Sequence, residues 1–518
     1  MMETGSMRRV LSFATITALG LGLGRVSGLA REMVVSAQFG LSAELDAYFL
    51  SFLVPAMINN IVAGGSITLA VMPTLTRYLA SNQRAEFWRV ASLITNVVLL
   101  VSLILTLLGI ALRQPIIALL GGGLAPATQI LAADLLVIMM PTLFISALLN
   151  MFLAMLNALN RFGAPALIFL ALNLGIIVTV VWLAPVIGVA AVAWGFLIGV
   201  LLQTVIQLIE LRRARASYHW LFDWRHPALT EVARAFIPIT ALTIVQQINL
   251  VVDKAMAATL PAGSISALAY ADTILGSFYA IGIALSIAVF PSLSRMAAVN
   301  DFENTARAVQ SSLRMLIFVL APLGAALIPF APHAIGLLLA RGRFDAAAVD
   351  LTAAALVMYA LGLVAIAALY VLPRVFNALG AHHIPLGVGA AMAVFHFALN
   401  AILMREFAHA GIALSTSLTA FATALVFLLL LKKKLRALDL RALFRYFFVC
   451  AFLAALCALA AASVFGLTGW GSETLAARIA GVAFAGASGA LYFFIALAAR
   501  IPESALIAQM IGGFLKKK

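Results

Sequence analysis

Apolar segments long enough to cross a bilayer recur along the whole chain and constrain its fold more than any other feature. The 518 residues are 64% hydrophobic and only 10% charged, and their mean hydropathy is +1.12. A hydrocarbon core about 30 Å thick needs roughly 20 apolar residues for each helical span. Because lipid offers no hydrogen-bond partners, such long apolar segments must satisfy their backbone groups internally, as helices do. The sequence therefore predicts an all-α polytopic membrane protein.

Turn signals and polar clusters divide the chain into about fourteen predicted helices. The predicted ranges are about 10–37, 46–79, 88–112, 127–158, 164–185, 187–211, 229–260, 264–298, 305–332, 346–377, 384–404, 410–431, 444–467 and 475–500. The first range begins like a signal peptide, but no small-residue cleavage site follows it, so we expect an uncleaved first span. A short amphipathic segment, "RQPIIALLGGGLAP", follows the third span.

The basic residues determine the predicted orientation of these helices. With the N-terminus inside, 25 of the 33 Lys and Arg residues fall on cytoplasmic segments and five fall on the opposite face. Cytoplasmic loops of membrane proteins carry an excess of basic residues, so we expect both termini to be cytoplasmic. The net charge of +14 then reflects topology and contact with anionic lipid headgroups. The basic residues are scattered over many short loops, which argues against binding to nucleic acid.

The chain resembles itself at an offset of about 218 to 220 residues. "PTLTRY" at 73–78 matches "PSLSRM" at 291–296, and "NAL" at 157–159 matches "NAL" at 377–379. Several short matches at nearly one offset, in chain order, indicate an internal duplication. The offset contains six predicted helices, and an even number preserves orientation. The two repeats are therefore parallel, with a pseudo-twofold axis along the membrane normal.

The repeat predicts how the chain is organised. We expect an N-terminal lobe at 1–211 with spans 1 to 6, a cytoplasmic linker at 212–228 and a C-terminal lobe at 229–436 with spans 7 to 12. The remaining residues, 437–518, supply two extra helices, spans 13 and 14, and a basic tail. Transporters built from such halves bind their substrate between the halves and rock them to alternate access.

Formal charges inside the first span are the strongest functional signal. The segment "GLGLGRVSGLAREMVVSAQFG" carries Arg25, Arg31 and Glu32, and its glycines at 20, 24 and 28 allow close approach of another helix. An arginine that faces lipid costs about 2.5 kcal/mol or more, so these groups need partners or water. One interpretation is a structural ion pair with Glu32 or with a carboxylate of another helix. The other, which we favour, is a cationic patch that lines a water-filled cavity.

Other polar groups lie in or beside the predicted spans. They are Asp46, Asn59 and Asn60 in span 2, Asp253 and Lys254 in span 7, Asp272 in span 8, and His396 and Asn400 in span 11. A cap-like pair is the alternative interpretation for Asp253 with Lys254. Interhelical hydrogen bonding is the favoured interpretation for His396 with Asn400. The polar groups of span 2 and of the second half support a cavity that the charges of span 1 share.

No pattern of an enzyme is present. The chain has no GxxxxGK[ST], HExxH or GxSxG motif and no metal-spaced set of Cys and His. Cys450 and Cys457 are seven residues apart in one apolar stretch, so we interpret them as buried thiols. The segments between the predicted spans are too short to hold a soluble catalytic domain. We expect a transporter and not an enzyme.

Several segments resemble a known family. "GRVSGLAREMVVSAQFGLSAELDAYFLSFLVP" closely resembles the first two spans of the MurJ/MviN lipid II flippases, and "MPTLTRY", "LPAGSISALAYAD" and "VFPSLSR" are also similar to that family. The resemblance covers the whole chain. It implies a monomer of the bacterial cytoplasmic membrane that moves lipid II, a peptidoglycan precursor linked to polyprenyl pyrophosphate, from the cytoplasmic to the outer leaflet. It also implies alternating access through a cationic cavity and no cofactor.

The resemblance assigns roles to individual residues. It implies substrate binding by Arg25, Arg31, Glu32, Asp46 and Asp272, and we add Asn59, Asn60 and Lys254 as polar groups of the same cavity. Some family members bind sodium in the second lobe. Asp253, Asn400 and Thr416 are similar to that site.

The chain departs from the family in two places. Asn59 and Asn60 stand in span 2 where the family usually has arginine, and Thr273 and Gly276 stand in span 8 where it usually has an arginine and an acidic residue. Lys254 is the expected replacement charge. The departures leave two alternatives open: a flippase for another undecaprenyl-linked glycan, and a cation-coupled multidrug antiporter of the same superfamily. For the antiporter we would expect twelve spans and a cavity dominated by carboxylates.

The predicted orientation can be tested by labelling the linker at 212–228. A single cysteine in place of Ser217, in a chain whose Cys450 and Cys457 are serines, is expected to react with a membrane-impermeant maleimide only after cells are permeabilised. The physical reason is the excess of basic residues on this side. A cysteine in place of Ser472, in a loop predicted to lie outside, is the positive control. Ready labelling at 217 in intact cells would overturn the orientation.

Overall fold

The structure, a computed structural model, describes residues 23–62, 66–161, 167–471 and 473–515. Every regular element within these ranges is a helix, and the predicted all-α membrane fold is confirmed. Nine described helices are long and apolar enough to cross a membrane, or ten if one bent pair counts as a span. Each of the fourteen predicted ranges overlaps a described helix. Fourteen as the number of spans stays a prediction.

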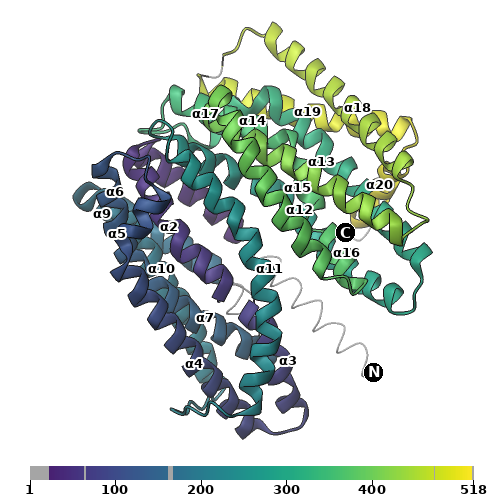
Figure 1. The fold of residues 1–518 in the computed structure, drawn as a ribbon. Coiled ribbons are helices and arrows are strands. Elements are labelled where there is room, and N and C mark those ends of the chain that lie inside the picture. Colours follow the sequence, from purple (N-terminus) through teal and green to yellow (C-terminus); the bar gives the residue numbers. More distant parts are fainter. Residues whose placement is uncertain (1–22, 63–65, 162–166, 472, 516–518) are drawn as a thin grey trace. The chain divides into compact units, whose positions relative to one another are not determined.

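One compact unit comprises Met1–Ser266 and Arg341–Phe344. Its helices are a helix over 23–39 and α2 (Ala43–Val62), α3 (Ser66–Ala80), α4 (Arg84–Ala111), α5 (Arg113–Leu120), α6 (Pro126–Met139), α7 (Pro141–Ala158), α9 (Ile168–Ile187), α10 (Ala190–Arg213) and α11 (Pro227–Ala257). α7 packs against α4 and α10, and α2 packs against α6, α7 and α11 (Figure 1). The predicted start of the first span, residues 10–22, lies outside the described residues.

Small residues bring α9 and α10 together. A Cβ atom on Gly175 would lie 2.7 Å from the Cα of Gly199, and one on Gly195 would lie 2.7 Å from the Cα of Ile176. Both distances are too short for any real side chain, so the backbones touch directly. Close backbone contact is how apolar helices gain packing energy in lipid, where burial of apolar surface contributes little.

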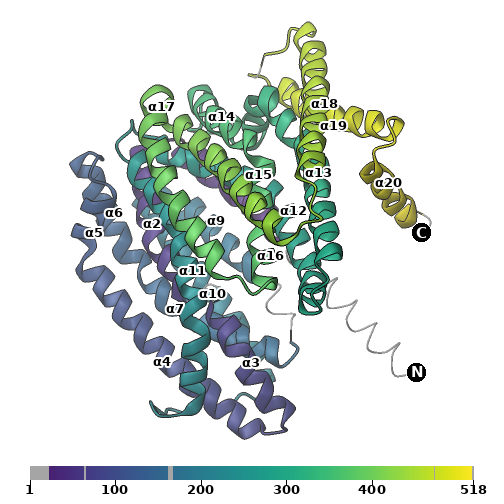
Figure 2. The ribbon, with the colours of Figure 1, turned by 45° about the vertical axis from the view of Figure 1, so that its right-hand side comes forward.

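The second compact unit comprises Ala267–Ala340 and Asp345–Lys518. Its helices are α12 (Ser264–Ala298, whose first turn belongs to the first unit), α13 (Phe302–Leu339), α14 (Ala346–Leu361), α15 (Leu363–Ala368), α16 (Leu372–Ala378), α17 (His383–Lys434), α18 (Leu440–Leu467), α19 (Leu475–Ala498) and α20 (Pro502–Leu515). α13 packs against α14, α18 and α19, which Figure 2 shows beside it. α13 is thus the central helix of this unit.

Two breaks bend the helices of the second unit. α14 and the pair α15–α16 differ in direction by 57°, and Gly362 stands at the break because a Cβ there would lie 2.5 Å from the Ser417 hydroxyl of α17. α17 itself contains two helices that meet at Ala408, whose φ of 48° and ψ of −131° are not helical. These two helices correspond to the predicted ranges 384–404 and 410–431.

Aspartate side chains cap the N-termini of several helices of the second unit. Asp301, Asp345 and Asp439 each accept a hydrogen bond from a backbone N–H in the first turn of α13, α14 and α18, at 2.9 to 3.1 Å. Such caps satisfy N–H groups that the helix cannot pair internally. The Asn304 side chain and backbone both donate to Asp301 and lower the pKa of its carboxyl.

The first compact unit extends beyond the predicted N-terminal lobe. α11 packs against α2 and α3, and the short segment 341–344 joins because the Arg343 backbone N–H donates to the Ala37 carbonyl oxygen at 2.8 Å. A compact unit in the structure need not have the same bounds as a repeat in the sequence. The repeat-based division stays a prediction: lobes at 1–211 and 229–436, a linker at 212–228 and appended residues 437–518.

Candidate functional site

The helix over 23–39 packs closely on α9 through its glycines. A Cβ on Gly24 would lie 2.7 Å from the Cβ of Phe169, and one on Gly28 would lie 3.6 Å from the Nδ2 atom of Asn173. The close approach predicted from the glycine spacing is therefore present at Gly24, whereas a Cβ at Gly28 would make an ordinary van der Waals contact. The third glycine of that pattern, Gly20, lies outside the described residues.

Asn173 of α9 organises the charges of this helix. Its Nδ2 atom donates to the Gly24 carbonyl oxygen at 3.2 Å and to the Ser27 Oγ atom at 2.9 Å. Its Oδ1 atom accepts a hydrogen bond from Arg31 at 3.2 Å. Asn173 is not among the residues predicted for the site. The signal was available, since Asn173 is an isolated amide in the apolar run "IFLALNLGIIV".

Arg31 and Glu32 form an ion pair. The Glu32 side chain is only 10% exposed and the Arg31 side chain is 27% exposed, so the carboxylate is buried beside its cation. This is the structural ion pair that the sequence left open as an alternative. An unpaired buried carboxylate would be costly, and the pair with Arg31 offsets part of that cost.

Arg25 has a different environment from Arg31. It is exposed, two turns before Glu32 on the same helix. Within the part of the chain that the structure describes, no hydrogen bond or ion pair engages its side chain. Because lipid exposure of an arginine is expensive, water or an anionic ligand is the environment that suits it.

Asp46 is buried at the start of α2, with 1% of its surface exposed. Its Oδ2 atom accepts from the backbone N–H of Gly263 at 2.6 Å, and its Oδ1 atom accepts from the N–H of Ser266 at 2.8 Å. Gly263 has a φ of +91°, which favours glycine, and a Cβ there would lie 3.1 Å from the Cβ of Leu41. Asp46 thus caps the start of α12 within the first unit, and its predicted role in substrate binding stays a prediction.

The other predicted polar residues of the first unit lie along α2 and α11. The Asn60 Nδ2 atom donates to the Gln247 side chain of α11 at 3.4 Å. The Lys254 Nζ atom donates to the Ile265 carbonyl oxygen at 3.4 Å and lies 5.3 Å from the centre of the Phe49 ring. The Asn59 Oδ1 atom is buried and accepts no hydrogen bond from a described residue.

Asp272 lies in the second unit, on α12. It is exposed and close enough to Tyr370 to interact with it electrostatically. Thr273, which stands where the family usually has arginine, donates to the Ala269 carbonyl oxygen of its own helix at 2.8 Å. This residue therefore contributes neither charge nor a free donor.

Asn400 belongs to a buried polar cluster inside the two helices of α17. The His396 ring lies 3.3 Å from the Asn400 Nδ2 atom and 3.2 Å from the hydroxyls of Ser415 and Thr419. The interhelical hydrogen bonding favoured for His396 is therefore present. Thr416 donates to the Ile412 carbonyl oxygen. Asp253 belongs to the first unit, so the predicted sodium-binding set stays a prediction.

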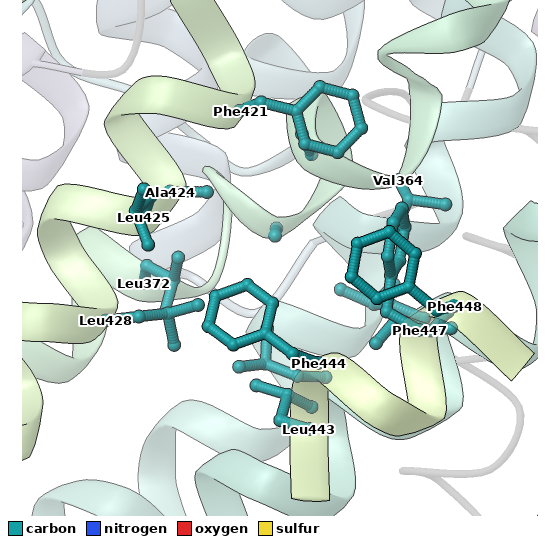
Figure 3. Close-up of a pocket in the computed structure, with 15 residues that line it drawn as sticks. Val364, Leu372, Phe421, Ala424, Leu425, Leu428, Leu443, Phe444, Phe447 and Phe448 are labelled. Atoms are coloured by element: carbon teal, nitrogen blue, oxygen red, sulfur yellow. The ribbon is translucent and has the colours of Figure 1, made fainter. Parts of the chain in front are cut away.

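An apolar pocket of about 190 Å³ opens in the second unit. α13, α15, α16, α17 and α18 contribute its walls, and Figure 3 shows the rings of Phe421, Phe444, Phe447 and Phe448 around it. All the side chains that line it are apolar. α18 is the helix predicted as span 13, outside the repeat.

Comparisons with known proteins agree on one family. Residues 35–481 match the family described as "Lipid II flippase MurJ". The chain is 28% identical over 431 residues to the lipid II flippase MurJ of Burkholderia cenocepacia, covering 81% of this chain and 84% of that one. It is 28% identical over 436 residues to the probable lipid II flippase MurJ of Vibrio cholerae, covering 81% and 82%.

Solved structures share the fold. An inward closed conformation of lipid II flippase MurJ superposes with a TM-score of 0.74 at 23% identity and covers 93% of this chain and 100% of that one. An inward-facing multidrug transporter of the MATE family superposes with a TM-score of 0.64 at 17% identity and covers 82% and 98%. At these identities the structural likeness establishes the fold alone.

Because Asp46 accepts hydrogen bonds from the backbone of Gly263 and Ser266, its substitution is expected to lower the stability of the protein. Asp46→Ala leaves two buried backbone N–H groups without an acceptor, which costs about 1–3 kcal/mol for each group. We expect a clear fall in the Tm of the purified protein, with Asp46→Asn intermediate because its amide oxygen still accepts. Glu44→Ala is the matched control, since Glu44 is an exposed carboxylate in the same helical turn. Equal Tm values for the two alanine variants would show that the Asp46 hydrogen bonds do not stabilise the fold.

Proposed function

Because this chain belongs to the lipid II flippase MurJ family, we propose that it moves lipid II from the cytoplasmic to the outer leaflet by alternating access. It is a multi-pass membrane transporter and not an enzyme. The observation that carries the proposal is the exposed Arg25, on the same helix as the Arg31–Glu32 pair. A transporter of neutral or cationic compounds gains nothing from this arrangement.

The pyrophosphate of the cargo matches the arginines. A guanidinium group presents its N–H donors in a planar fork that pairs with two phosphate oxygens at once. Arg25 is the first contact in this scheme because no described residue engages it. Arg31 follows by exchanging Glu32 for a phosphate oxygen. Lys254, Asn59, Asn60, Asp46 and Asp272 are the further polar groups that we propose for the sugar–peptide head.

The polyprenyl tail of the cargo requires an apolar site. The pocket among α13, α15, α16, α17 and α18 is lined only by apolar side chains. A tail that enters it from the bilayer gains van der Waals contacts with these side chains, since transfer from lipid to an apolar pocket contributes little by itself. We propose that part of the tail lies against Phe444, Phe447 and Phe448. Span 13, which is α18, would then have a role in holding the tail.

A flippase for another undecaprenyl-linked glycan is the second candidate. It shares the pyrophosphate and the tail, and the absence of arginine at Asn59, Asn60 and Thr273 favours a head group that differs from that of lipid II. The multidrug antiporter is supported only by the fold that it shares with the MATE transporter. We further propose that the protein acts as a monomer in the bacterial cytoplasmic membrane, with both termini on the cytoplasmic side.

Complementation of a strain depleted of its own lipid II flippase tests the proposal. Arg25→Ala or Arg31→Ala is expected to reduce transport by about tenfold to a hundredfold, because each removes a charge-assisted contact of about 1.5–3 kcal/mol. Arg25→Lys should restore little, since lysine cannot form the bidentate contact. Membrane insertion and Tm should stay close to those of the unsubstituted protein for Arg25→Ala. Asp350→Ala is the control, because Asp350 is an exposed carboxylate near the start of α14, and it should transport normally.

A double variant separates cargo binding from a purely structural ion pair. Arg31→Ala leaves the Glu32 carboxylate unpaired, whereas Arg31→Ala with Glu32→Gln removes both charges. If the pair is only structural, the double variant recovers transport and Tm together. If Arg31 binds pyrophosphate, Tm recovers and transport does not. Normal transport by both Arg25→Ala and Arg31→Ala would refute the cationic-site mechanism, and failure of the unsubstituted chain to complement would favour the other glycan.

We also propose that sodium binds Asp253, Asn400 and Thr416 at one stage of the transport cycle. Carboxylate, amide and hydroxyl oxygens are hard ligands that suit a hard cation. Replacing potassium by sodium at constant ionic strength should raise the Tm of the unsubstituted protein by mass action. Asp253→Asn and Thr416→Val should abolish that rise, while Asp350→Asn should keep it. The sodium site is abandoned if sodium and potassium give the same Tm.

A further inference from the structure

Large aromatic side chains are exposed on a loop where a water-soluble surface would not carry them. Residues 216–226, here called the aromatic loop, connect α10 to α11 within the first unit (Figure 1). Tyr218, Trp220, Phe222 and Trp224 occupy every second position. Trp220 is 78% exposed and Trp224 is 63% exposed. Neither residue belongs to the cationic site of the proposed function.

The aromatic loop is held along α4 by its backbone. The Asn96 Nδ2 atom donates to the Leu221 carbonyl oxygen at 2.9 Å and to the His219 carbonyl oxygen at 3.3 Å. The Tyr218 hydroxyl donates to the Asn96 Oδ1 atom at 2.5 Å, and the His219 N–H donates to the Ser92 hydroxyl at 3.1 Å. One buried amide thus binds the loop at three points, so the loop has a defined conformation.

This attachment creates an apolar groove of about 580 Å³. Leu100 and Leu103 of α4 and Phe144 of α7 form one side, and the rings of Trp220, Phe222 and Trp224 form the other. The Trp220 and Phe222 rings meet edge to face at 5.6 Å, and Phe222 stacks with Trp224 at 6.3 Å. The groove therefore has a preformed aromatic wall.

The membrane is the surrounding medium on the α4 side of the groove. α4 is one of the helices long and apolar enough to span a bilayer, and Leu100, Leu103 and Leu107 on it are exposed. Tryptophan and tyrosine concentrate at membrane–water interfaces, where the ring meets lipid and its polar atom meets water. An apolar helix and interfacial aromatic rings together favour lipid as the cover of the groove.

Cations lie at one end of the groove. Arg89 is 11 residues before Leu100, three helical turns earlier on the same face of α4 and about 16 Å away along its axis. Its side chain is 57% exposed, with Glu86 at 3.9 Å. Arg225 follows Trp224 directly and is exposed. Two carboxylates, Glu86 and Asp223, share this end; Glu86 also faces His226 at 3.5 Å, and Asp223 accepts the Arg225 N–H at 3.1 Å.

We propose that this groove binds an anionic phospholipid of the bilayer, with an acyl chain between α4 and the aromatic loop and the phosphate at Arg89 and Arg225. The order along α4, a cation followed by an apolar face, matches the order of headgroup and chain in a phospholipid. The loop thereby fixes α4 and the start of α11 to the membrane surface.

Quenching of tryptophan fluorescence by brominated lipids tests the site. The full chain has six tryptophans, and changing Trp182, Trp194, Trp224 and Trp470 to Phe leaves Trp220 and Trp88, of which Trp88 is only 5% exposed. The protein is placed in phosphatidylcholine vesicles that contain a minor fraction of phosphatidylglycerol, and either lipid carries bromine on its upper acyl chain. We expect stronger quenching of Trp220 by brominated phosphatidylglycerol than by brominated phosphatidylcholine at equal mole fraction.

Headgroup selectivity assigns the phosphate contact. Arg89→Gln and Arg225→Gln should each lower the preference for phosphatidylglycerol by up to about fivefold, the effect of one basic residue near a membrane surface. Arg307→Gln, at an exposed arginine of the other unit, should leave it unchanged. The control for general lipid contact is a chain that keeps Trp182 and has Phe in place of Trp220. Trp182 is 75% exposed on α9, and both brominated lipids should quench it equally.

Three results would overturn the proposal. Trp220 quenched by aqueous acrylamide but by neither brominated lipid would place the aromatic loop in water. Equal quenching by the two brominated lipids would make the loop a general interfacial anchor without a phospholipid site. Relief of quenching by a small amount of undecaprenyl phosphate would assign the groove to a polyprenyl chain. None of these results bears on Arg25 or Arg31, so the proposed function is tested separately.

Discussion

The hydrogen bonds of one buried amide, Asn173, support the part of the molecule on which the proposed function depends. In lipid no water is available to pair a charged or polar group, so each group must find its partner inside the protein. Asn173 donates to the helix over 23–39 and accepts from Arg31, while Arg31 pairs with Glu32. The same contacts bring that helix close enough to α9 for Gly24 to touch Phe169. The same hydrogen bonds of Asn173 therefore serve both helix packing and charge placement. Loss of this amide would loosen the helix over 23–39 and expose the Arg31–Glu32 ion pair.

The two acidic residues near this site satisfy the same constraint differently. Glu32 is paired with a side chain, and its partner can exchange it for another anion. Asp46 is paired with backbone N–H groups of Gly263 and Ser266, which no anion displaces without unfolding the start of α12. A carboxylate held by two backbone donors is suited to joining elements, here α2 and the first turn of α12 within the first unit. One held by an arginine side chain is suited to ligand exchange. This difference makes Glu32 the stronger candidate for a role in transport and Asp46 the stronger candidate for a role in stability.

Much of the fold and part of the site could be predicted from the sequence. The lengths of the apolar segments predicted the helices, and the glycine spacing predicted that another helix packs against Gly24 and Gly28. Both predictions depend only on local residue properties. The ion pair of Arg31 with Glu32 was one of two alternatives, and the sequence could not choose between them since the choice depends on which atoms are buried. Asn173 was missed because its partners are about 140 residues away. The same holds for Asn96, whose importance lies in the carbonyl groups of Leu221 and His219.

If the helix over 23–39 binds a pyrophosphate as we propose, its balance of charge bears on how the cargo is released as well as how it is bound. With Glu32 paired to Arg31, the three charges of this helix sum to one positive charge, carried by Arg25. A pyrophosphate diester brings two negative charges, so full neutralisation requires Arg31 to leave Glu32. That exchange limits affinity, because the gain from the second phosphate contact is offset by leaving a carboxylate with 10% of its surface exposed without its partner. A carrier must let go of its cargo on the far side. Two unpaired arginines would hold a pyrophosphate more strongly, and in the proposed mechanism the Glu32 carboxylate is the competing anion that restores the empty site.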